Sequence, residues 1–375
     1  MTIDTLWYTR CPVPTASGIA HGLGTLADAA SGAGLDFRIL QDADAQTALH
    51  HFDHQLTGLI REGGNVPALA ARAAGAPTRL IGLTWVDEAQ QILVAADSDI
   101  SSAADLAGRR IAIPAWAADG GRSFPRAMAL HGFSSALTSA GLTLTDVVVV
   151  EVDVERAPEV RDSSPAAASS GAQTHSDATS SRADRGRAVT TPGLAELIAG
   201  TVDAIYVKGA RGADAAREHG LRVAVDLDTE TSLRGRVNNG TPRPITVHSQ
   251  LLDEHPEVVV DFLVRSLDAA AWAATDLPGV RKLLARETFA EGSGVENAYG
   301  EDFHVGLVPT LDAERLDLLA VQEQFLYTHG FLEGRVYVAA WADPAPLEQA
   351  LAVIAARADS RPVSPEAARA QGVPA

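Results

Sequence analysis

The sequence is poor in cysteine, in positive charge and in long apolar runs, and each shortage excludes a class of function. Cys11 is the one cysteine among 375 residues, so an intrachain disulfide and a metal site built from several cysteines are excluded. Lysine and arginine number 30 against 48 acidic residues, and the formal charge of −18 argues against binding to nucleic acid or to an anionic membrane. No apolar run is long enough to span a membrane, and the start of the chain, MTIDTLWYTR, shows no secretion signal. We therefore expect a cytoplasmic protein that binds neither nucleic acid nor a membrane.

What the sequence does contain is an alternation of β-prone and helical segments. Hydrophobic residues make up 46% of the chain, which suits a globular protein with real cores. In the N-terminal half, β-prone runs at 5–8, 35–40 and 79–84 are separated by helical stretches. Strands separated by helices pair in parallel, so this pattern predicts an α/β fold.

The chain length predicts two units, at about 150 residues per domain. A capped turn and a strand at 101–113 open the second unit, and a strand signal near 245–248 returns the chain to the first. We therefore predict two α/β lobes with the ligand site in the cleft between them. Lobe 1 consists of 1–105 and 240–375, and lobe 2 consists of 106–239.

A serine- and alanine-rich segment at about 155–187 interrupts lobe 2. It holds seven serines between Ser163 and Ser181 and almost no large apolar residue. Such a segment cannot bury enough surface to order itself, so we predict a flexible insertion. A disordered surface loop and a substrate-gating lid are the two interpretations of this insertion.

Cys11 directly follows the first predicted strand, where a reactive side chain would face the cleft. It lies between Arg10 and Pro12 in a turn and not inside an apolar run. A neighbouring cation and a helix that starts just downstream both favour a thiolate. The alternative is that Cys11 is a small buried hydrophobic residue.

Arg61 precedes the pair Gly63–Gly64, and a helix follows the pair. Glycines before a helix free backbone N–H groups at the positive end of the helix dipole, which can bind an anion. Arginine adds a planar fork that fits an anion with two oxygens. The alternative is a helix cap beside a surface arginine.

Three histidines lie between these two features, at His50, His51 and His54. His50 and His54 have the i, i+4 spacing of a helical metal site, but there is no HExxH pattern and no further ligand cluster, so we expect no metal and no cofactor. A histidine with a near-neutral pKa can instead deprotonate the thiol or donate a hydrogen bond to an anion. For each one alone, solvated surface is the alternative.

The order of segments resembles that of type II periplasmic binding proteins, especially the sulfonate, nitrate and thiamine-precursor group. The resemblance lies in 101–113, 141–152 (GLTLTDVVVVEV), 200–205 (GTVDAI) and 249–262. These segments specify the fold and leave the ligand open.

A set of short motifs resembles one family more specifically. Residues 8–14, YTRCPVP, resemble the segment around the nucleophilic cysteine of the 2'-hydroxybiphenyl-2-sulfinate desulfinase family, which acts in bacterial dibenzothiophene desulfurisation. The spacing of His51, Arg61 and Gly63–Gly64 is similar to that family's histidine, arginine and glycine-pair segment. Further similar segments are 101–113, 299–303, 307–312, 324–326 and 341–342. The likeness runs from about residue 4 to residue 342 and omits the serine-rich segment.

This resemblance implies an enzyme that cleaves the aryl carbon–sulfur bond of an aromatic sulfinate with water, giving an arene and sulfite. Such an enzyme is a hydrolase acting on carbon–sulfur bonds. By the resemblance, Cys11 would be the catalytic cysteine, His51 its partner, and Arg61 with the Gly64 amide would bind the sulfinate, with Gly63 next to them in the substrate-binding segment.

The same resemblance suggests residues that contact the aromatic body of the substrate. Phe133 falls where the family has a tryptophan against the biphenyl, and Trp7 and Phe52 are further candidate walls. His54 and Gly58 depart from the family's apolar lining, so the arene itself stays open. We expect a small-molecule aryl sulfinate as the partner, and a monomer.

Two chemical routes fit, and the sequence leaves both open. A Cys11 thiolate attacks sulfur and forms a thiosulfonate-like intermediate that water hydrolyses, or the Cys11 thiol protonates the ipso carbon and sulfur dioxide leaves. The rival function is a non-catalytic binding protein for a sulfonate or similar anion, which explains Arg61 but not Cys11. A relative of thiamine-pyrimidine synthases is a third interpretation, and its histidine-rich iron site would have to come from 50–54.

Overall fold

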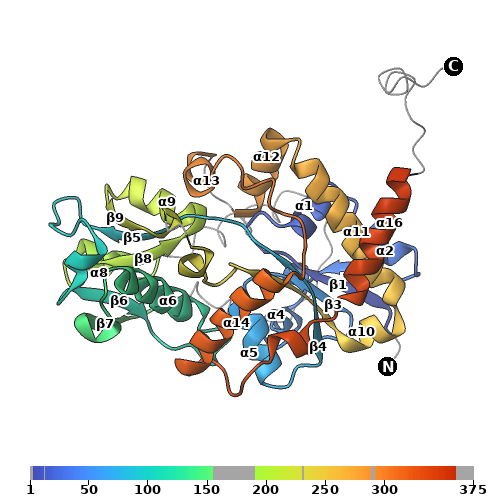
Figure 1. Ribbon diagram of the computed structural model, residues 1–375, viewed down its shortest axis with the longest axis horizontal. Coiled ribbons are helices and arrows are strands. Elements are labelled where there is room, and N and C mark those ends of the chain that lie inside the picture. The colour runs from blue at the N-terminus through green and yellow to red at the C-terminus, as the bar shows by residue number, and fades with distance from the viewer. Residues whose placement is uncertain (1–2, 12, 155–190, 230–231, 289–291, 360–375) are drawn as a thin grey trace, which may run out of the picture.

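The computed structural model describes residues 3–11, 13–154, 191–229, 232–288 and 292–359. The insertion predicted at 155–187 lies outside the described residues. Figure 1 shows two lobes side by side, one built on β1–β4 with β10 and the other on β5–β9. This arrangement confirms the predicted two-lobed α/β fold.

The sheet of the first lobe has five strands in the order β2-β1-β3-β10-β4. β1 (Thr5–Thr9) lies parallel between β2 (Asp36–Ile39) and β3 (Leu59–Glu62). β10 (Arg243–His248) comes from far along the chain and runs antiparallel between β3 and β4 (Thr78–Thr84). The carboxyl ends of β1 and β3 therefore meet the first residue of β10 at one edge of the sheet.

The second lobe contains two smaller sheets, which together repeat the strand order of the first lobe. β5 (Gln90–Val94) lies antiparallel between β8 (Ile205–Lys208) and β9 (Arg222–Asp226). β6 (Arg110–Pro114) lies parallel to β7 (Val148–Val152), and a bridge between residues 111 and 204 joins the two sheets. Because β5 pairs within the second lobe, the chain enters that lobe at β5, earlier than the boundary that the sequence places at 105.

Helices surround both sheets (Figure 1). Those that precede β5 or follow β10 are α1 (Ala16–Gly22), α2 (Asp28–Ser31), α3 (Ala45–Ala48), α4 (His50–Asp53), α5 (Asn65–Ala73), α10 (Ser249–Glu254), α11 (Pro256–Ala273), α12 (Leu277–Thr288), α13 (Gly292–Ala298), α14 (Ala313–Thr328), α15 (Val338–Trp341) and α16 (Ala345–Asp359). Those between β5 and β10 are α6 (Phe124–Ser139), α8 (Leu194–Ile198) and α9 (Gly209–Glu218). None of these described helices is long and apolar enough to cross a membrane.

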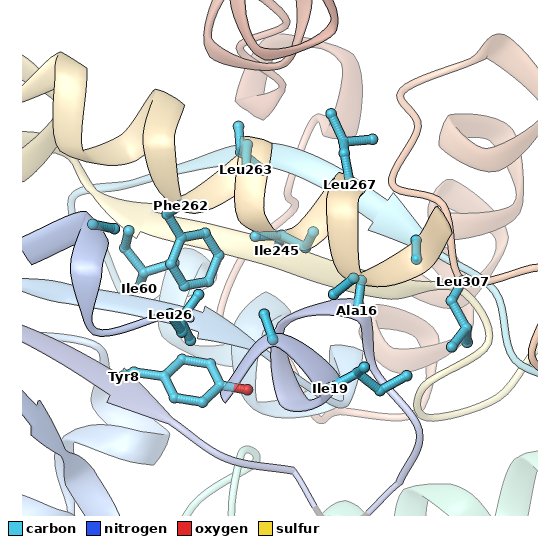
Figure 2. Packing of buried hydrophobic residues seen from close by; sticks show 14 of the residues in the cluster. Tyr8, Ala16, Ile19, Leu26, Ile60, Ile245, Phe262, Leu263, Leu267 and Leu307 are labelled. Atoms are coloured by element: carbon cyan, nitrogen blue, oxygen red, sulfur yellow. The ribbon is translucent and has the colours of Figure 1, made fainter. Parts of the chain in front are cut away.

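Helix α11 supplies much of the first-lobe core. Pro256 stands in its first turn, where the missing N–H of proline costs no hydrogen bond. The apolar face of α11 packs into the cluster that contains Ile60 of β3 and Ile245 of β10. Figure 2 shows Phe262 of α11 in this cluster, with its ring centroid 6.0 Å from that of Tyr8 on β1. The strands that end at the candidate site are therefore fixed from one side by a buried apolar layer.

Candidate functional site

Cys11 lies just beyond the end of β1, at the edge of the sheet where β3 ends and β10 begins. A tight turn follows, in which the Val13 N–H donates to the Cys11 carbonyl over 2.8 Å. Thr15 then caps α1 by accepting a hydrogen bond from the Gly18 N–H. The Cys11 side chain is partly exposed, so a ligand can reach the thiol.

The Cys11 sulfur accepts a hydrogen bond from Arg243, with Nη1 3.2 Å from Sγ. Arg243 is 2% exposed, and its Nη2 lies 3.4 Å from Oε1 of Glu88, which is also buried. Arg243 opens β10, and Glu88 lies on the crossover into β5. Neither residue is predicted from the sequence, because 232 positions separate Arg243 from Cys11 and no local motif links them.

Arg61 reaches the same edge from β3, where it pairs with Thr9 of β1. It is 1% exposed, and its Nη1 donates to the Gly64 carbonyl over 2.9 Å. Its Nε is buried without a hydrogen-bond partner among the described residues. Burial lowers the pKa of Arg61 to about 10, while Cys11 raises it and Arg243 lowers it. The side chain is therefore a cation at neutral pH and lies close to both residues.

The glycine pair after Arg61 allows close packing at this edge. A Cβ on Gly63 would lie 2.8 Å from Cζ of Arg61, closer than real Cβ contacts allow. A Cβ on Gly64 would overlap the side chain of Asn239, whose Oδ1 accepts a hydrogen bond from the first turn of α5 over 3.0 Å. The Gly63 N–H donates to the Pro244 carbonyl over 3.2 Å. Of the two amides predicted to bind an anion, the Gly63 amide is thus already engaged with the sheet.

His51 lies on α4, and its Nδ1 is 2.8 Å from Oγ1 of Thr9. Gln41 Nε2 donates to the same oxygen over 2.8 Å. The Thr9 hydroxyl can then donate its proton to Nδ1 of a neutral ring that carries its own proton on Nε2. Burial, reinforced by the charge of Arg61, lowers the pKa of His51 to about 3. His51 is therefore a neutral N–H donor at physiological pH. Among the described residues it makes no hydrogen bond to Cys11.

The neighbouring histidines make structural contacts. His50 Nδ1 lies 2.7 Å from Oδ1 of Asp53 in a partly exposed pair. His54 is buried, adopts a left-handed backbone conformation with φ of 54°, and its Nε2 lies 3.0 Å from the His51 carbonyl. No group of three or more potential metal ligands occurs in the part of the chain that the structure describes. Of the three histidines, His51 is the one whose ring contacts Thr9 of β1.

A buried carboxylate fixes β3 beneath the site. Glu62 follows Arg61 in the strand and has no exposed surface. It accepts hydrogen bonds from the Ser17 N–H over 3.0 Å, from the Ser17 hydroxyl over 2.5 Å and from the Thr84 hydroxyl over 2.8 Å. These bonds offset the cost of burying the charge and tie β3 to α1 and β4. Glu62 is not among the residues predicted from the sequence, although an acidic residue in an apolar strand is a signal for such a role.

The structure separates the three aromatic residues predicted to line the site. Phe52 stands edge-on to His51, with 4.9 Å between the ring centroids. Trp7 lies on the same face of β1 as Thr9, by the alternation of side chains along a strand. Phe133 has no exposed surface and packs in the second-lobe core, because the face of α6 that carries it is directed into that core. Phe133 therefore offers no open wall for a substrate in this structure, in contrast to the expectation.

Comparison with known proteins gives the site a context. Residues 31–175 match a family model described as NMT1/THI5 like. A curated 2'-hydroxybiphenyl-2-sulfinate desulfinase from Rhodococcus erythropolis is 32% identical over 356 residues, which cover 93% of this chain and 94% of the relative.

Solved structures agree with this match. The desulfurization enzyme DSZB aligns with a TM-score of 0.71 at 28% identity and covers 94% of this chain and 99% of its own. A cysteine-to-serine variant of DSZB in complex with biphenyl-2-sulfinic acid aligns with a TM-score of 0.68 at 27% identity, over 94% of this chain and 100% of its own. The periplasmic aliphatic sulphonate binding protein of Escherichia coli shares the fold, with a TM-score of 0.61 at 16% identity over 92% of this chain and 93% of its own.

Proposed function

The chain belongs to the 2'-hydroxybiphenyl-2-sulfinate desulfinase family, and from that premise we propose that it is an enzyme that cleaves the aryl carbon–sulfur bond of an aromatic sulfinate. The substrate class is a small aryl sulfinate of the kind bound to the DSZB variant, biphenyl-2-sulfinic acid. The products are the arene and sulfite, with water as the second substrate, which makes the reaction a hydrolysis.

The observation that carries this proposal is that two buried guanidinium groups, those of Arg243 and Arg61, lie near Cys11. Arg243 donates to the Cys11 sulfur, and Arg61 holds a buried Nε–H with no partner among the described residues. A sulfinate is an anion with two oxygens on one sulfur, and parallel N–H donors of a guanidinium match that geometry. In a chain with a formal charge of −18, this local excess of positive charge selects an anion and places its sulfur beside the thiol.

Two routes lead from this arrangement to the products. In the first, the Cys11 thiolate forms a bond to the sulfinate sulfur, the aryl carbon–sulfur bond breaks, and the ipso carbon takes a proton. Water then cleaves the new sulfur–sulfur bond, which releases sulfite and a proton and restores the thiolate. In the second, the Cys11 thiol gives its proton to the ipso carbon, and the electron pair of the carbon–sulfur bond returns to the ring. Sulfur dioxide leaves and takes up water, which yields sulfite and returns a proton to the thiolate.

His51 serves either route as a neutral donor. Its pKa of about 3 keeps the ring uncharged, and when Nδ1 accepts the Thr9 hydroxyl proton, the Nε2–H is available to donate. A neutral donor stabilises a sulfinate oxygen or a developing charge without adding a third cation beside Arg61. His51 therefore assists Cys11 by orienting the sulfinate and stabilising its charge, and not by taking the proton of the thiol.

Sulfite release from biphenyl-2-sulfinate tests the proposed function. We expect the wild-type protein to release sulfite and biphenyl in equal amounts, and Cys11→Ser to bind the sulfinate in calorimetry without releasing sulfite. Thr145→Ser, a similar change at an exposed turn of the second lobe, is the matched control and should behave as wild type. If the wild type binds the sulfinate but releases no sulfite, the protein is an anion-binding protein on this fold. If Cys11→Ser keeps its turnover, Cys11 has no part in the reaction.

A further inference from the structure

Arg243 contacts the Cys11 sulfur, and the resemblance that points to the other site residues assigns it no role. Its Nη1 lies 3.2 Å from Sγ, within hydrogen-bond distance for sulfur. A neutral thiol accepts hydrogen bonds weakly, whereas a thiolate accepts a charge-assisted bond from a guanidinium strongly. We propose that Arg243 is a catalytic residue, whose guanidinium stabilises the negative charge on the Cys11 sulfur during the reaction. This inference rests on the proposed desulfinase activity and deepens it.

The Arg243 side chain is held in place by buried neighbours. Its Nη2 lies 3.4 Å from Oε1 of Glu88, and the same carboxylate accepts a hydrogen bond from the Tyr299 hydroxyl over 3.3 Å. Lys208 Nζ lies 3.4 Å from Oε1 of Glu88, with only 3% of its side chain exposed. Gly240 leaves room for the guanidinium, because a Cβ there would lie 2.5 Å from Nη2. The Arg243 guanidinium therefore contacts the buried Glu88 carboxylate with one nitrogen and the Cys11 sulfur with the other.

The electrostatic surroundings of Cys11 favour this role. The ionisable groups that interact with Cys11 through their charges include Arg61, Arg243, Tyr8 and Tyr299. Burial raises the pKa of both tyrosines, so their hydroxyls stay protonated at neutral pH. Burial alone would lower the pKa of Arg243, but the negative groups around it raise it, so Arg243 stays charged. Within this set, the charges that act on the sulfur are thus both positive.

Both chemical routes place a negative charge on the sulfur that Arg243 contacts. In the attack route the thiolate is the nucleophile, and the guanidinium increases its population. In the protonation route the charge appears when the thiol proton moves to the ipso carbon, and the guanidinium stabilises it as it forms. Arg61 in this account binds the sulfinate, and Arg243 acts on the cysteine.

Alkylation of Cys11 tests the inference without any sulfinate. The chain has one cysteine, so iodoacetamide modifies one site, and the rate at each pH follows the thiolate fraction. Removing the guanidinium takes away the charge-assisted hydrogen bond to the thiolate, so we expect Arg243→Gln to be alkylated about tenfold more slowly at pH 7. The rate should recover when the pH is raised, which a mere loss of access to the thiol would not produce. Arg110→Gln, which removes a guanidinium from the Asp203 pair in the second lobe, is the matched control.

Turnover measured on the same variants completes the test. We expect Arg243→Gln to lose most of its kcat for sulfite release while Arg110→Gln keeps it. Arg243→Lys keeps a charge opposite Glu88 and is a second variant in case Arg243→Gln does not fold. One ammonium group cannot contact both Glu88 and the sulfur, so this variant should also be alkylated more slowly than wild type. Wild-type alkylation and turnover in either folded variant would overturn the inference. Slow, pH-rescued alkylation in a protein that releases no sulfite would instead refute the proposed function and leave the thiolate contact standing.

Discussion

Gly63→Ala is a test of the site in which the substituted residue offers no side chain to the substrate. The new Cβ would lie 2.8 Å from Cζ of Arg61, whereas ordinary contacts begin at 3.4 Å. The guanidinium is buried and bonded to the Gly64 carbonyl, so it cannot swing into solvent and must shift by several tenths of an ångström or more. Gly63 does not have a positive φ, so alanine fits its backbone and the effect is one of packing.

The size of the effect follows from this displacement. A misplacement of about 1 Å costs about a hundredfold in rate, so kcat/KM for sulfite release should fall by roughly 30- to 100-fold, or about 2–3 kcal/mol in the barrier. Initial rates with biphenyl-2-sulfinate below KM measure this directly, alongside the melting temperature. Gly32→Ala is the matched control: Gly32 has a helical φ of −63°, and its nearest neighbour would be the Asp28 carbonyl at 3.9 Å. A folded Gly63→Ala protein with kcat/KM within about threefold of wild type would refute the reasoning, because so small a change leaves no displaced guanidinium.

Three further predictions concern single side chains. Arg61→Lys keeps the charge but loses the paired donors, so the barrier measured by kcat/KM for sulfite release should rise by about 2–4 kcal/mol, and by more in Arg61→Ala. A lysine variant with the kcat/KM of the wild type would exclude paired hydrogen bonds to the sulfinate. The pKa of His51 is about 3 in the folded protein and 6.5 in the unfolded chain, so the unfolded chain binds a proton more readily between these values. The contribution of His51 to the free energy of unfolding is therefore complete above pH 6.5 and is lost as the pH falls toward 3. His51→Asn should therefore reduce the pH slope of the unfolding free energy in that window by up to about 1.4 kcal/mol per pH unit, and an unchanged slope would contradict the burial of a neutral ring. Phe133→Ala should lower the unfolding free energy by about 3–5 kcal/mol in denaturant titrations while KM stays near wild type, whereas a rise in KM without loss of stability would return Phe133 to the substrate site.

The parts of the site that the sequence predicts lie close together in the chain. Cys11, His51 and Arg61 belong to the first three strand–helix units, and local turn and glycine signals mark their positions. Arg243 reaches the same edge because β10 inserts antiparallel between β3 and β4. Glu88 lies where the chain leaves the first lobe, and Arg243 lies where the chain returns to it. Pairing between strands so distant leaves no periodicity in one sequence, and so these residues could not be predicted.

The errors of the sequence interpretation have a similar physical origin. Strand β5 has the same local pattern as the first-lobe strands, and only its pairing with β8 and β9 assigns it to the second lobe. Helix α6 is apolar on several faces, so its pattern does not say whether Phe133 is directed at the cleft or the core. The alternation of strands and helices, by contrast, depends on short-range signals, and the predicted fold is confirmed.

The ion pair between Arg243 and Glu88 joins the two segments by which the chain passes from one lobe to the other. A rigid-body rotation of the lobes takes place about such connecting segments, and points near a rotation axis move least. The sulfur of Cys11 is hydrogen-bonded to Arg243 and therefore lies beside these connecting segments, where a rotation of one lobe against the other would displace it least. An opening of the lobes that admits a flat aromatic molecule would for this reason change the distance between sulfur and guanidinium less than distances farther from the connecting segments.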